Sequence, residues 1–479
     1  MSIGLALQTA LTGLQTNQAR TAVLSRNISN ALTPGYTRKE AVLASLTVGG
    51  EGRGVYVSEI RRSVDASLAR EVRSQNSAYS AKQAQAAILQ TYTQLIGQPQ
   101  DERSLSSAIN QLETAFLALE DLPESPTQQR AVVDAAVTLT SRLNTTSKAI
   151  TDARQQADAG IAEAVTDINS TLKQLEGLNR QVAVRTGSGQ DSSELQDQRD
   201  RLLDSLSEKV GIQYYTRDAN EVVVLTSTGV PLLDGSARQL EFSPTAVVGP
   251  TDAYPGGALS GLTVDGHDIA PGGGYPLALR GGSLEGLFAV RDQVMPEMQR
   301  QVDTVAKTLI EQFTAADSTG GSLFVGGAIG GSNAGWAANI RVNNAVLLSE
   351  GGNPALVRTG LNAPTGSVPV GDTTQLQKFI AVFTKPVAFP ADAGLMTSGT
   401  IKDFTNAAIS QQHAVRASAS ADSTSLNIQL ETVRASREAS EGVNVEEELQ
   451  ELIVLERTYA ANAQIMQTAA RMLDKLLEI

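Results

Sequence analysis

An apolar side chain recurs every third or fourth residue along the last part of the chain. Nine of the ten positions in this stripe are apolar, and the ten are Val445, Leu449, Leu452, Glu456, Tyr459, Ala463, Met466, Ala470, Leu473 and Leu477. The seven-residue repeat predicts a coiled-coil helix, about 50 Å long at 1.5 Å per residue. Because a stripe this narrow cannot bury itself, we expect a partner helix from the same chain or from neighbouring copies.

The first part of the chain offers such a partner helix over 3–30. The same spacing recurs at Leu7, Ala10, Leu14, Asn17, Thr21, Leu24 and Ile28, and Leu11 and Val23 widen the stripe. The helix is predicted to end before Thr33-Pro34-Gly35, since proline lacks the amide that a helix interior needs. The ordinary alternative is that both terminal helices pack on the core of a globular domain.

Charge also favours a contact between the two ends of the chain. Residues 1–100 contain ten Lys and Arg against five Asp and Glu, whereas residues 426–479 contain five against ten. Opposite net charges select a partner more than they add stability. The cluster Glu446-Glu447-Glu448 has two interpretations: a favourable charge in the first turn of the C-terminal helix, or a contact for basic residues of a neighbour.

Between the two ends, helical periodicity alternates with short runs of β type. Helices are predicted over 64–96, 103–120, 126–186, 192–209, 283–316 and 401–439. Extended structure is predicted over 36–62, and strands are predicted within 211–280 and 318–397. Arg-Asp and Gln-Arg pairs on the helices are interpreted as solvated faces or as ordinary contacts between helices.

These patterns predict a mainly α fold with a β-rich insertion, an α+β multidomain protein of three parts. Residues 1–65 and 436–479 would form a terminal helical assembly layer of coiled-coil helices. Residues 66–210, 281–317 and 398–435 would form a helical-bundle domain. Residues 211–280 and 318–397 would form an outer β-rich domain.

Composition argues against catalysis and against nucleic-acid binding. The chain has no cysteine and only two histidines, His267 and His413, so thiol chemistry and multi-histidine metal sites lack their residues. A net charge of −13 disfavours nucleic acid, and no apolar run reaches the roughly 20 residues of a membrane span. The N-terminal segment has no basic residue before Arg20, unlike a cleaved signal peptide.

Residues 264–268 are interpreted as a β-turn rather than a metal loop. We expect no enzymatic activity, no cofactor and no metal, and neither nucleic acid nor membrane as a partner.

Two segments carry a family resemblance. One reads Asn27-Ile28-Ser29-Asn30-Ala31-Leu32-Thr33-Pro34-Gly35-Tyr36-Thr37-Arg38, and the other begins at Ser440-Glu441-Gly442 and continues through Tyr459-Ala460-Ala461-Asn462 into the stripe. They resemble the N-terminal and C-terminal signatures of the bacterial flagellar axial proteins, which comprise rod, hook and hook-associated proteins. The ending Pro-Gly-Tyr-Thr-Arg and interior stretches near 52–65, 116–130, 195–200 and 282–296 are similar to the hook-associated branch.

This resemblance implies a structural subunit at the junction between hook and filament that assembles by docking of its terminal helices. It implies an extracellular position in the flagellum, reached by flagellar type III export without a cleaved signal peptide. The implied partners are identical copies in a ring, the hook protein, the next hook-associated junction protein, and a dedicated export chaperone that binds the C-terminal helix. The signatures and the two stripes together give the expected assembly residues, which are Leu7, Leu11, Leu14, Leu24, Asn27, Ile28, Asn30, Gly35, Tyr36, Val445, Leu449, Leu452, Tyr459, Met466, Leu473 and Leu477.

Two alternatives stay open. Another axial protein, such as the hook or the distal rod protein, would share both signatures, although Tyr36-Thr37-Arg38 and the long helical middle favour the hook-associated branch. An exported hydrolase with flagellar-type ends would need a pair of carboxylates in the β-rich part, where none stands out. If assembly alone buries the stripes, the free subunit should have protease-sensitive ends and a resistant middle near 66–435.

Overall fold

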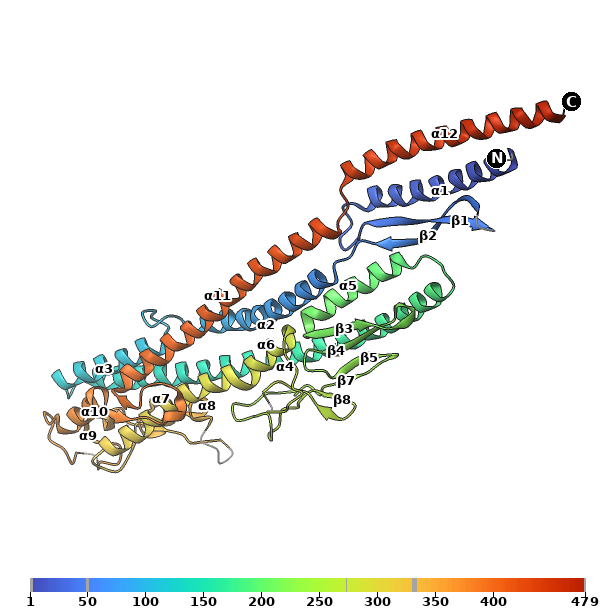
Figure 1. Cartoon of the computed structure of the whole chain (residues 1–479). Coiled ribbons are helices and arrows are strands. Elements are labelled where there is room, and N and C mark those ends of the chain that lie inside the picture. The colour runs from blue at the N-terminus through green and yellow to red at the C-terminus, as the bar shows by residue number, and fades with distance from the viewer. Residues whose placement is uncertain (1–2, 49–50, 273, 330–333, 365, 478–479) are drawn as a thin grey trace. The chain divides into compact units, whose positions relative to one another are not determined.

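The computed structural model describes residues 3–48, 51–272, 274–329, 334–364 and 366–477, and it divides into two compact units. Unit 1 comprises Met1–Tyr79, Asp167–Gln239 and Leu426–Ile479, and unit 2 comprises Ser80–Thr166 and Leu240–Ser425. Three long helices contribute residues to both units, and they are α2 (Ala66–Ile96), α4 (Pro126–Gly187) and α11 (Ile401–Glu441) (Figure 1).

In unit 1 the two ends of the chain lie together. Helices α1 (Ile3–Asn30) and α12 (Val445–Leu477) run side by side, and β1 (Lys39–Val48) and β2 (Glu51–Arg62) form an antiparallel hairpin against α1 (Figure 1). The approach of α1 to β2 requires glycine at position 54. Gly54 has a φ of +132°, and a Cβ there would lie 2.0 Å from Oγ1 of Thr12.

The rest of unit 1 joins helix α5 (Ser193–Lys209) to an antiparallel sheet in the order β3-β4-β5-β6. The strands are β3 (Ile212–Thr216), β4 (Val222–Thr226), β5 (Pro231–Asp234) and β6 (Ser236–Ala237), with a 3₁₀ turn at Asp218–Asn220. The side chain of Asn179 in α4 donates to the carbonyl of Val222 at 2.7 Å and accepts from its amide at 3.2 Å. This pair of hydrogen bonds fastens the buried strand β4 to α4.

Unit 2 is a helical core that carries short strands. Its other helices are α3 (Leu105–Asp121), α6 (Gly282–Ala289), a π-helical turn (Val290–Val294), α7 (Met295–Ala316), α8 (Trp336–Asn339), α9 (Leu356–Thr359) and α10 (Thr374–Thr384), with 3₁₀ turns at Asn344–Val346, Leu348–Glu350 and Ala391–Ala393. Its strands are β7 (Leu240–Glu241), β8 (Thr263–Val264), β9 (His267–Asp268), β10 (Phe324–Val325), β11 (Arg341–Val342), β12 (Val387–Ala388) and β13 (Ser398–Gly399). They pair as β7-β8-β9, β10-β11 and β12-β13. The centre of this core contains four buried aromatic rings, those of Phe116, Phe313, Phe379 and Phe383.

A buried ionic cluster joins α4 to the π-helical turn in unit 2. The Arg291 side chain is 0% exposed, and it donates to Asp158 at 2.6 Å and to both oxygens of Asp292 at 2.9 Å. The ring of Phe288 lies 4.8 Å from its guanidinium carbon. Arg154 donates to the carbonyl of Arg291 at 2.9 Å. Because these charges are paired and hydrogen-bonded, the cluster can exist in an apolar core.

The predicted fold class is confirmed, because the chain is mainly helical, its long terminal helices pack together, and its sheets are small and antiparallel. The helix predicted over 3–30 is α1, which has the same ends, and the range 36–62, predicted to be extended, contains the β1–β2 hairpin. The two-residue turn at Asp265 and Gly266, both with positive φ, confirms a β-turn between β8 and β9.

The structure differs most from the sequence expectation in 318–397. The strands there are only two residues long, and α10 lies among them, because Leu376, Phe379 and Phe383 have a helical spacing and are buried. The two ranges expected to form one outer domain are also divided at Gln239, with β3–β6 in unit 1 and the remainder in unit 2. The three-part division of the chain stays a prediction.

Candidate assembly interface

The α1–α12 pair is held by one narrow apolar seam. The buried apolar residues are Ala10, Leu14, Val23 and Leu24 on α1, which also packs against the β1–β2 hairpin, and Leu455 and Ala469 on α12. Leu452 and Met466 are half-buried along the same line of α12. The partner helix that the stripe requires is therefore supplied, in part, by the same chain.

This seam covers only one side of the predicted C-terminal stripe. Along α12, buried or half-buried positions recur seven residues apart at Glu448, Leu455, Asn462 and Ala469. Leu449, which belongs to the stripe, remains 46% exposed, and Val445, Tyr459 and Leu473 are also exposed. A single neighbouring helix thus leaves much of the apolar surface of α12 in water.

The structure places the expected assembly residues in three groups. Leu14, Leu24 and Asn27 are buried in the chain. The half-buried residues are Leu7, Ile28, Asn30, Tyr36, Leu452 and Met466. The exposed residues are Leu11, Gly35, Val445, Leu449, Tyr459 and Leu473, and the side chain of Leu477 lies outside the described part. Whether the exposed members contact other copies stays a prediction.

Asn27 is the centre of the N-terminal signature. Its Nδ2 donates to the carbonyl of Lys39 at 2.8 Å and to Oε2 of Glu448 at 2.9 Å. Its Oδ1 accepts from the amide of Lys39 at 3.1 Å and from the hydroxyl of Tyr36 at 2.9 Å. The buried amide thus makes four hydrogen bonds, and it joins α1, the start of β1 and the first turn of α12.

Tyr36, Gly35 and Asn30 shape the turn that follows α1. Burial, with Glu194 and Asp197 nearby, raises the pKa of Tyr36, so its hydroxyl stays protonated and donates to Asn27. Gly35 has a φ of +74°, and a Cβ there would lie 2.7 Å from Cγ of Arg201. Asn30 donates to the carbonyl of Arg26 and accepts from the hydroxyl of Thr33, both of which lie close to this turn.

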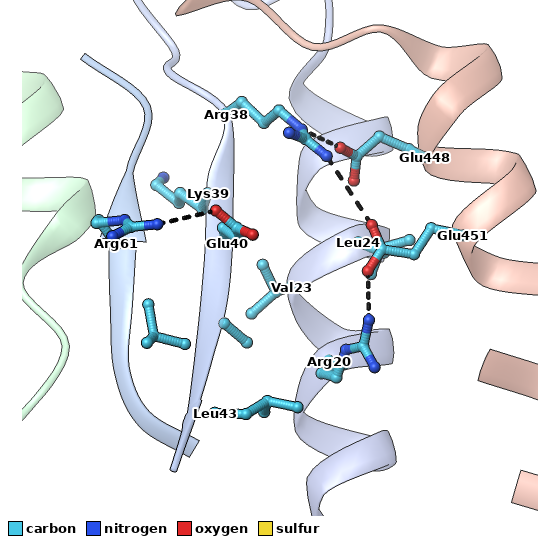
Figure 2. A pocket seen from close by; sticks show the side chains of 12 residues that line it. Arg20, Val23, Leu24, Arg38, Lys39, Glu40, Leu43, Arg61, Glu448 and Glu451 are labelled. Carbon is cyan, nitrogen blue, oxygen red and sulfur yellow. Dashed lines mark hydrogen bonds and ion pairs between the residues drawn. The ribbon is translucent and has the colours of Figure 1, made fainter. Parts of the chain in front are cut away.

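The opposite charges of the two ends meet within the chain. Arg38 Nε donates to Glu448 at 2.6 Å, and Arg20 Nη2 donates to Glu451 at 2.6 Å (Figure 2). Arg38 Nη2 lies 3.9 Å from the second oxygen of Glu451. Glu448 therefore meets a basic residue of its own chain, whereas Glu446 and Glu447 are exposed in the first turn of α12. Their position fits the helix-charge interpretation of the acidic cluster.

The sequence interpretation missed a ladder of acids on α5. Asp197 lies 3.1 Å from Lys39 and 2.7 Å from Arg62, while Asp204 lies 2.6 Å from Arg73. Asp200 pairs with both Arg62 and Arg73. Neither interpretation holds for Asp197, which is buried against Lys39 of β1 and Arg62 of β2. The pairing of Asp200 and Asp204 with Arg73 of α2 is a contact between helices, as the second interpretation has it. The signal was the spacing of Glu194, Asp197, Asp200 and Asp204, which places four acids along one side of a helix.

This ladder predicts loss of stability in acid. Burial opposes the charged form of Asp200, but Arg62 and Arg73 outweigh it and hold the pKa of Asp200 below its ordinary value. A carboxyl whose pKa is lower in the folded chain than in the unfolded chain stabilises the fold at any pH above its unfolded pKa, which is about 3.9. This stabilisation is lost as the pH falls further. We expect the urea midpoint of the wild type to exceed that of Asp200→Asn at neutral pH. The difference should shrink as pH falls below about 4, because the unfolded chain binds a proton at Asp200 before the folded chain does. A difference that stayed constant with pH would contradict this origin.

Two grooves flank the α1–α12 pair. The first, of about 620 Å³, is lined by Thr21 and Ala22 of α1 and by Leu452, Glu456 and Tyr459 of α12. The second, of about 410 Å³, is lined by Ala6 of α1 and by Ala461, Ile465, Thr468 and Met472 of α12. Glu456 and Ile465 are nine residues apart, which at about 3.6 residues per turn places them on opposite sides of α12. We call these the Tyr459 groove and the Ile465 groove.

The surface around α1 and α12 is suited to packing against another protein surface. A third pocket of about 280 Å³ lies between α1, β1 and α12, and six of its charged side chains form the pairs Arg20–Glu451, Arg38–Glu448 and Arg61–Glu40 (Figure 2). Among the described residues, no group of three or more His, Cys, Asp and Glu is arranged to hold a metal ion. None of the described helices is long and apolar enough to span a membrane.

Comparison with protein families gives three matches along the chain. The model of the flagellar hook-associated protein FlgK helical domain matches residues 89–332, about half of the chain. The model of the flagella basal body rod protein matches residues 7–37, which include most of α1 and all of the Asn27 signature except Arg38. The C-terminal model of the flagellar basal body rod proteins FlgEFG matches residues 438–479, which include α12.

Individual relatives agree with these matches. The chain is 29% identical to flagellar hook-associated protein 1 of Salmonella typhimurium over 65% of its own length and 56% of that protein. It is 24% identical to flagellar hook-associated protein 1 of Bacillus subtilis over 98% of its length and 97% of that protein. The chain thus spans just over half of the Salmonella relative and nearly all of the Bacillus one. A solved structure, the flagellar hook junction protein FlgK from Burkholderia pseudomallei, aligns with a TM-score of 0.46 and 25% identity over 54% of this chain and 47% of that one.

Proposed function

We propose, from the premise that this chain belongs to the flagellar hook-associated protein FlgK family, that it is a structural subunit joining the flagellar hook to the filament. The observation that carries this proposal is the α1–α12 pair, which is closed along one seam and keeps apolar grooves on two sides. A protein that works as a monomer rarely exposes two such apolar surfaces to water, whereas in a tube the neighbouring subunits cover both sides. The role is structural and needs no catalytic group.

Assembly follows from the geometry of the two grooves. Neighbouring copies would pack apolar side chains into the Tyr459 groove and the Ile465 groove, and the removal of this surface from water would drive docking. In unit 1, α12 packs mainly on α1 and keeps much of its apolar surface in water, so we infer that the two ends become fully ordered only in the assembly. In the free subunit, incomplete order at both ends would make them sensitive to proteases, as the sequence predicts.

The proposed partners follow from the position of the subunit in the flagellum. They are identical copies in a ring, the hook protein on one side, and the next hook-associated junction protein on the other. Before assembly, a dedicated export chaperone would cover α12, whose exposed apolar residues include Val454 and Ile465. The absence of cysteine from the chain suits a position outside the cell, where a free thiol could cross-link.

A deletion strain of the source bacterium tests this function. Cells that lack this protein should build complete hooks without attached filaments, and the gene supplied in trans should restore filaments and swimming. Electron microscopy of purified hooks from both strains gives the answer. Cells without hooks would instead indicate a hook or distal rod protein, and normal filaments would reject the junction role.

A further inference from the structure

The chain bends at Gly442, between α11, which ends at Glu441, and α12, which begins at Val445 (Figure 1). Glu441 is buried, and its carboxylate accepts from the amide of Asp65 at 2.9 Å and from Nε of Arg437 at 2.9 Å. Arg437 also donates to Asp204 of α5 at 3.0 Å. On the other side of the bend, the side chain of Asn444 accepts from the amide of Glu446 and caps α12. The end of α11 and the start of α12 are thus each well anchored.

Arg38 contacts both sides of this bend. Its amide donates to the carbonyl of Glu441 at 2.8 Å, and its own carbonyl accepts from the amide of Ser63 at 2.8 Å. Its guanidinium group reaches the other way, to Glu448 at 2.6 Å and towards Glu451 (Figure 2). The backbone of Arg38 therefore holds the last residue of α11, while its side chain holds the first two turns of α12.

Neighbouring polar residues each contact only one side. Asn27 binds Glu448 of α12, and Arg20 binds Glu451 of α12, and neither has a hydrogen bond to α11 among those described. Arg437 lies in α11 and binds Glu441 and Asp204, but it does not reach α12. The segment between the helices contains Gly442, so the bend needs an external support to have one fixed angle.

We propose that Arg38 is the positioning residue that fixes the angle between α11 and α12, and so fixes the direction in which the α1–α12 pair leaves the rest of unit 1. The Glu448 side chain is 1% exposed, so its charge depends on the two donors that it meets, Arg38 and Asn27. Loss of the guanidinium group would leave this carboxylate with one donor fewer, and α12, still packed on α1, could turn together with it about Gly442. The consequence for assembly rests on the proposed function, because neighbours can dock only on a pair that has a defined direction.

Distances between spin labels on α11 and α12 test this proposal in the free subunit. The chain has no cysteine, so Gln429→Cys and Arg457→Cys, at exposed positions in α11 and α12, provide two specific labelling sites. The full-length protein with Arg38 intact should give one narrow distance distribution. Arg38→Met should lose that single distance and give a broad distribution, whereas Arg38→Lys should recover it in part, because a lysine can reach one carboxylate but not both.

Arg20→Met is the matched control. It removes the ion pair between α1 and Glu451 but leaves both contacts of Arg38, so the narrow distribution should persist. A narrow distribution in Arg38→Met, or a broad one in the parent protein, would overturn the proposal. If circular dichroism showed that Arg38→Met is unfolded, Glu448→Gln would replace it, with the same broadening expected. Because these distances are measured without assembly, they can stand even if the junction function fails, and they can fail while it stands.

Discussion

Ile465→Asp is expected to abolish incorporation of the subunit into the flagellum without changing the stability of the free protein. Ile465 is 49% exposed and lines the Ile465 groove, so in the free subunit an aspartate there would remain in water. Its effect on unfolding should stay within about 0.5 kcal/mol, as for most surface substitutions. If a neighbour covers the groove, the same carboxylate becomes buried without a partner, at a cost of several kcal/mol per contact. Swimming assays and electron microscopy of complemented deletion cells measure incorporation, and urea unfolding measures stability.

Ile428→Asp provides the matched control for this prediction. Ile428 is 62% exposed on α11 and lines neither of the two grooves, so the same change of residue alters surface charge without blocking them. Cells with Ile428→Asp should keep their filaments. Normal filaments in both variants would mean that the Ile465 groove stays open to water in the assembly, and loss of filaments in both would point to a general effect of charge.

Arg291→Met is expected to have the largest effect on the stability of unit 2. Arg291 is fully buried, and its removal would leave Asp158 and Asp292 without their shared cation. Burial already raises the pKa of Asp292 even with this cation present. Breaking a buried pair in this way costs about 3–5 kcal/mol, because a charge is left uncompensated in an apolar surrounding. Denaturant unfolding, followed by a signal from unit 2 such as the fluorescence of Trp336, should show a transition at clearly lower denaturant.

The control is Arg300→Met, two turns further along the same helical stretch. Arg300 is exposed, and the one hydrogen bond of its side chain among the described residues is to the carbonyl of Asp392, so this variant should unfold within about 0.5 kcal/mol of the wild type. If the Arg291 and Arg300 variants were equally stable, the buried ionic cluster would contribute no more to the free energy of unfolding than the packing of a methionine does.

The sequence predicts the helices well because their periodicity is a direct result of burial. The stripe from Val445 to Leu477 specified α12, and the Pro34 turn specified the end of α1. The face that α12 turns towards α1 was not predictable in the same way. A stripe shows that one side is apolar, but the seam at Leu455 and Ala469 depends on the angle at which a particular partner packs.

The polar part of the site was harder to predict from the pattern. Asn27 stood out only through its signature, since hydropathy does not separate a buried amide that makes four hydrogen bonds from a solvated one. Asp197 looked like a surface acid because its partners, Lys39 and Arg62, are distant in sequence. In 318–397 the glycines and prolines favour short strands, whereas the helical spacing of Leu376, Phe379 and Phe383 indicates the helix α10 that the structure contains.

Chemical accessibility of Ile465→Cys tests the assembly role of the α1–α12 pair most directly. The chain has no native cysteine, so a maleimide reports on this one position, and a denatured sample gives the rate for full exposure. In the free subunit the introduced thiol should react readily, because the Ile465 groove is open there. In purified hooks with attached filaments it should be protected. Equal reaction rates in the free and assembled protein would contradict the burial of this groove by neighbouring copies.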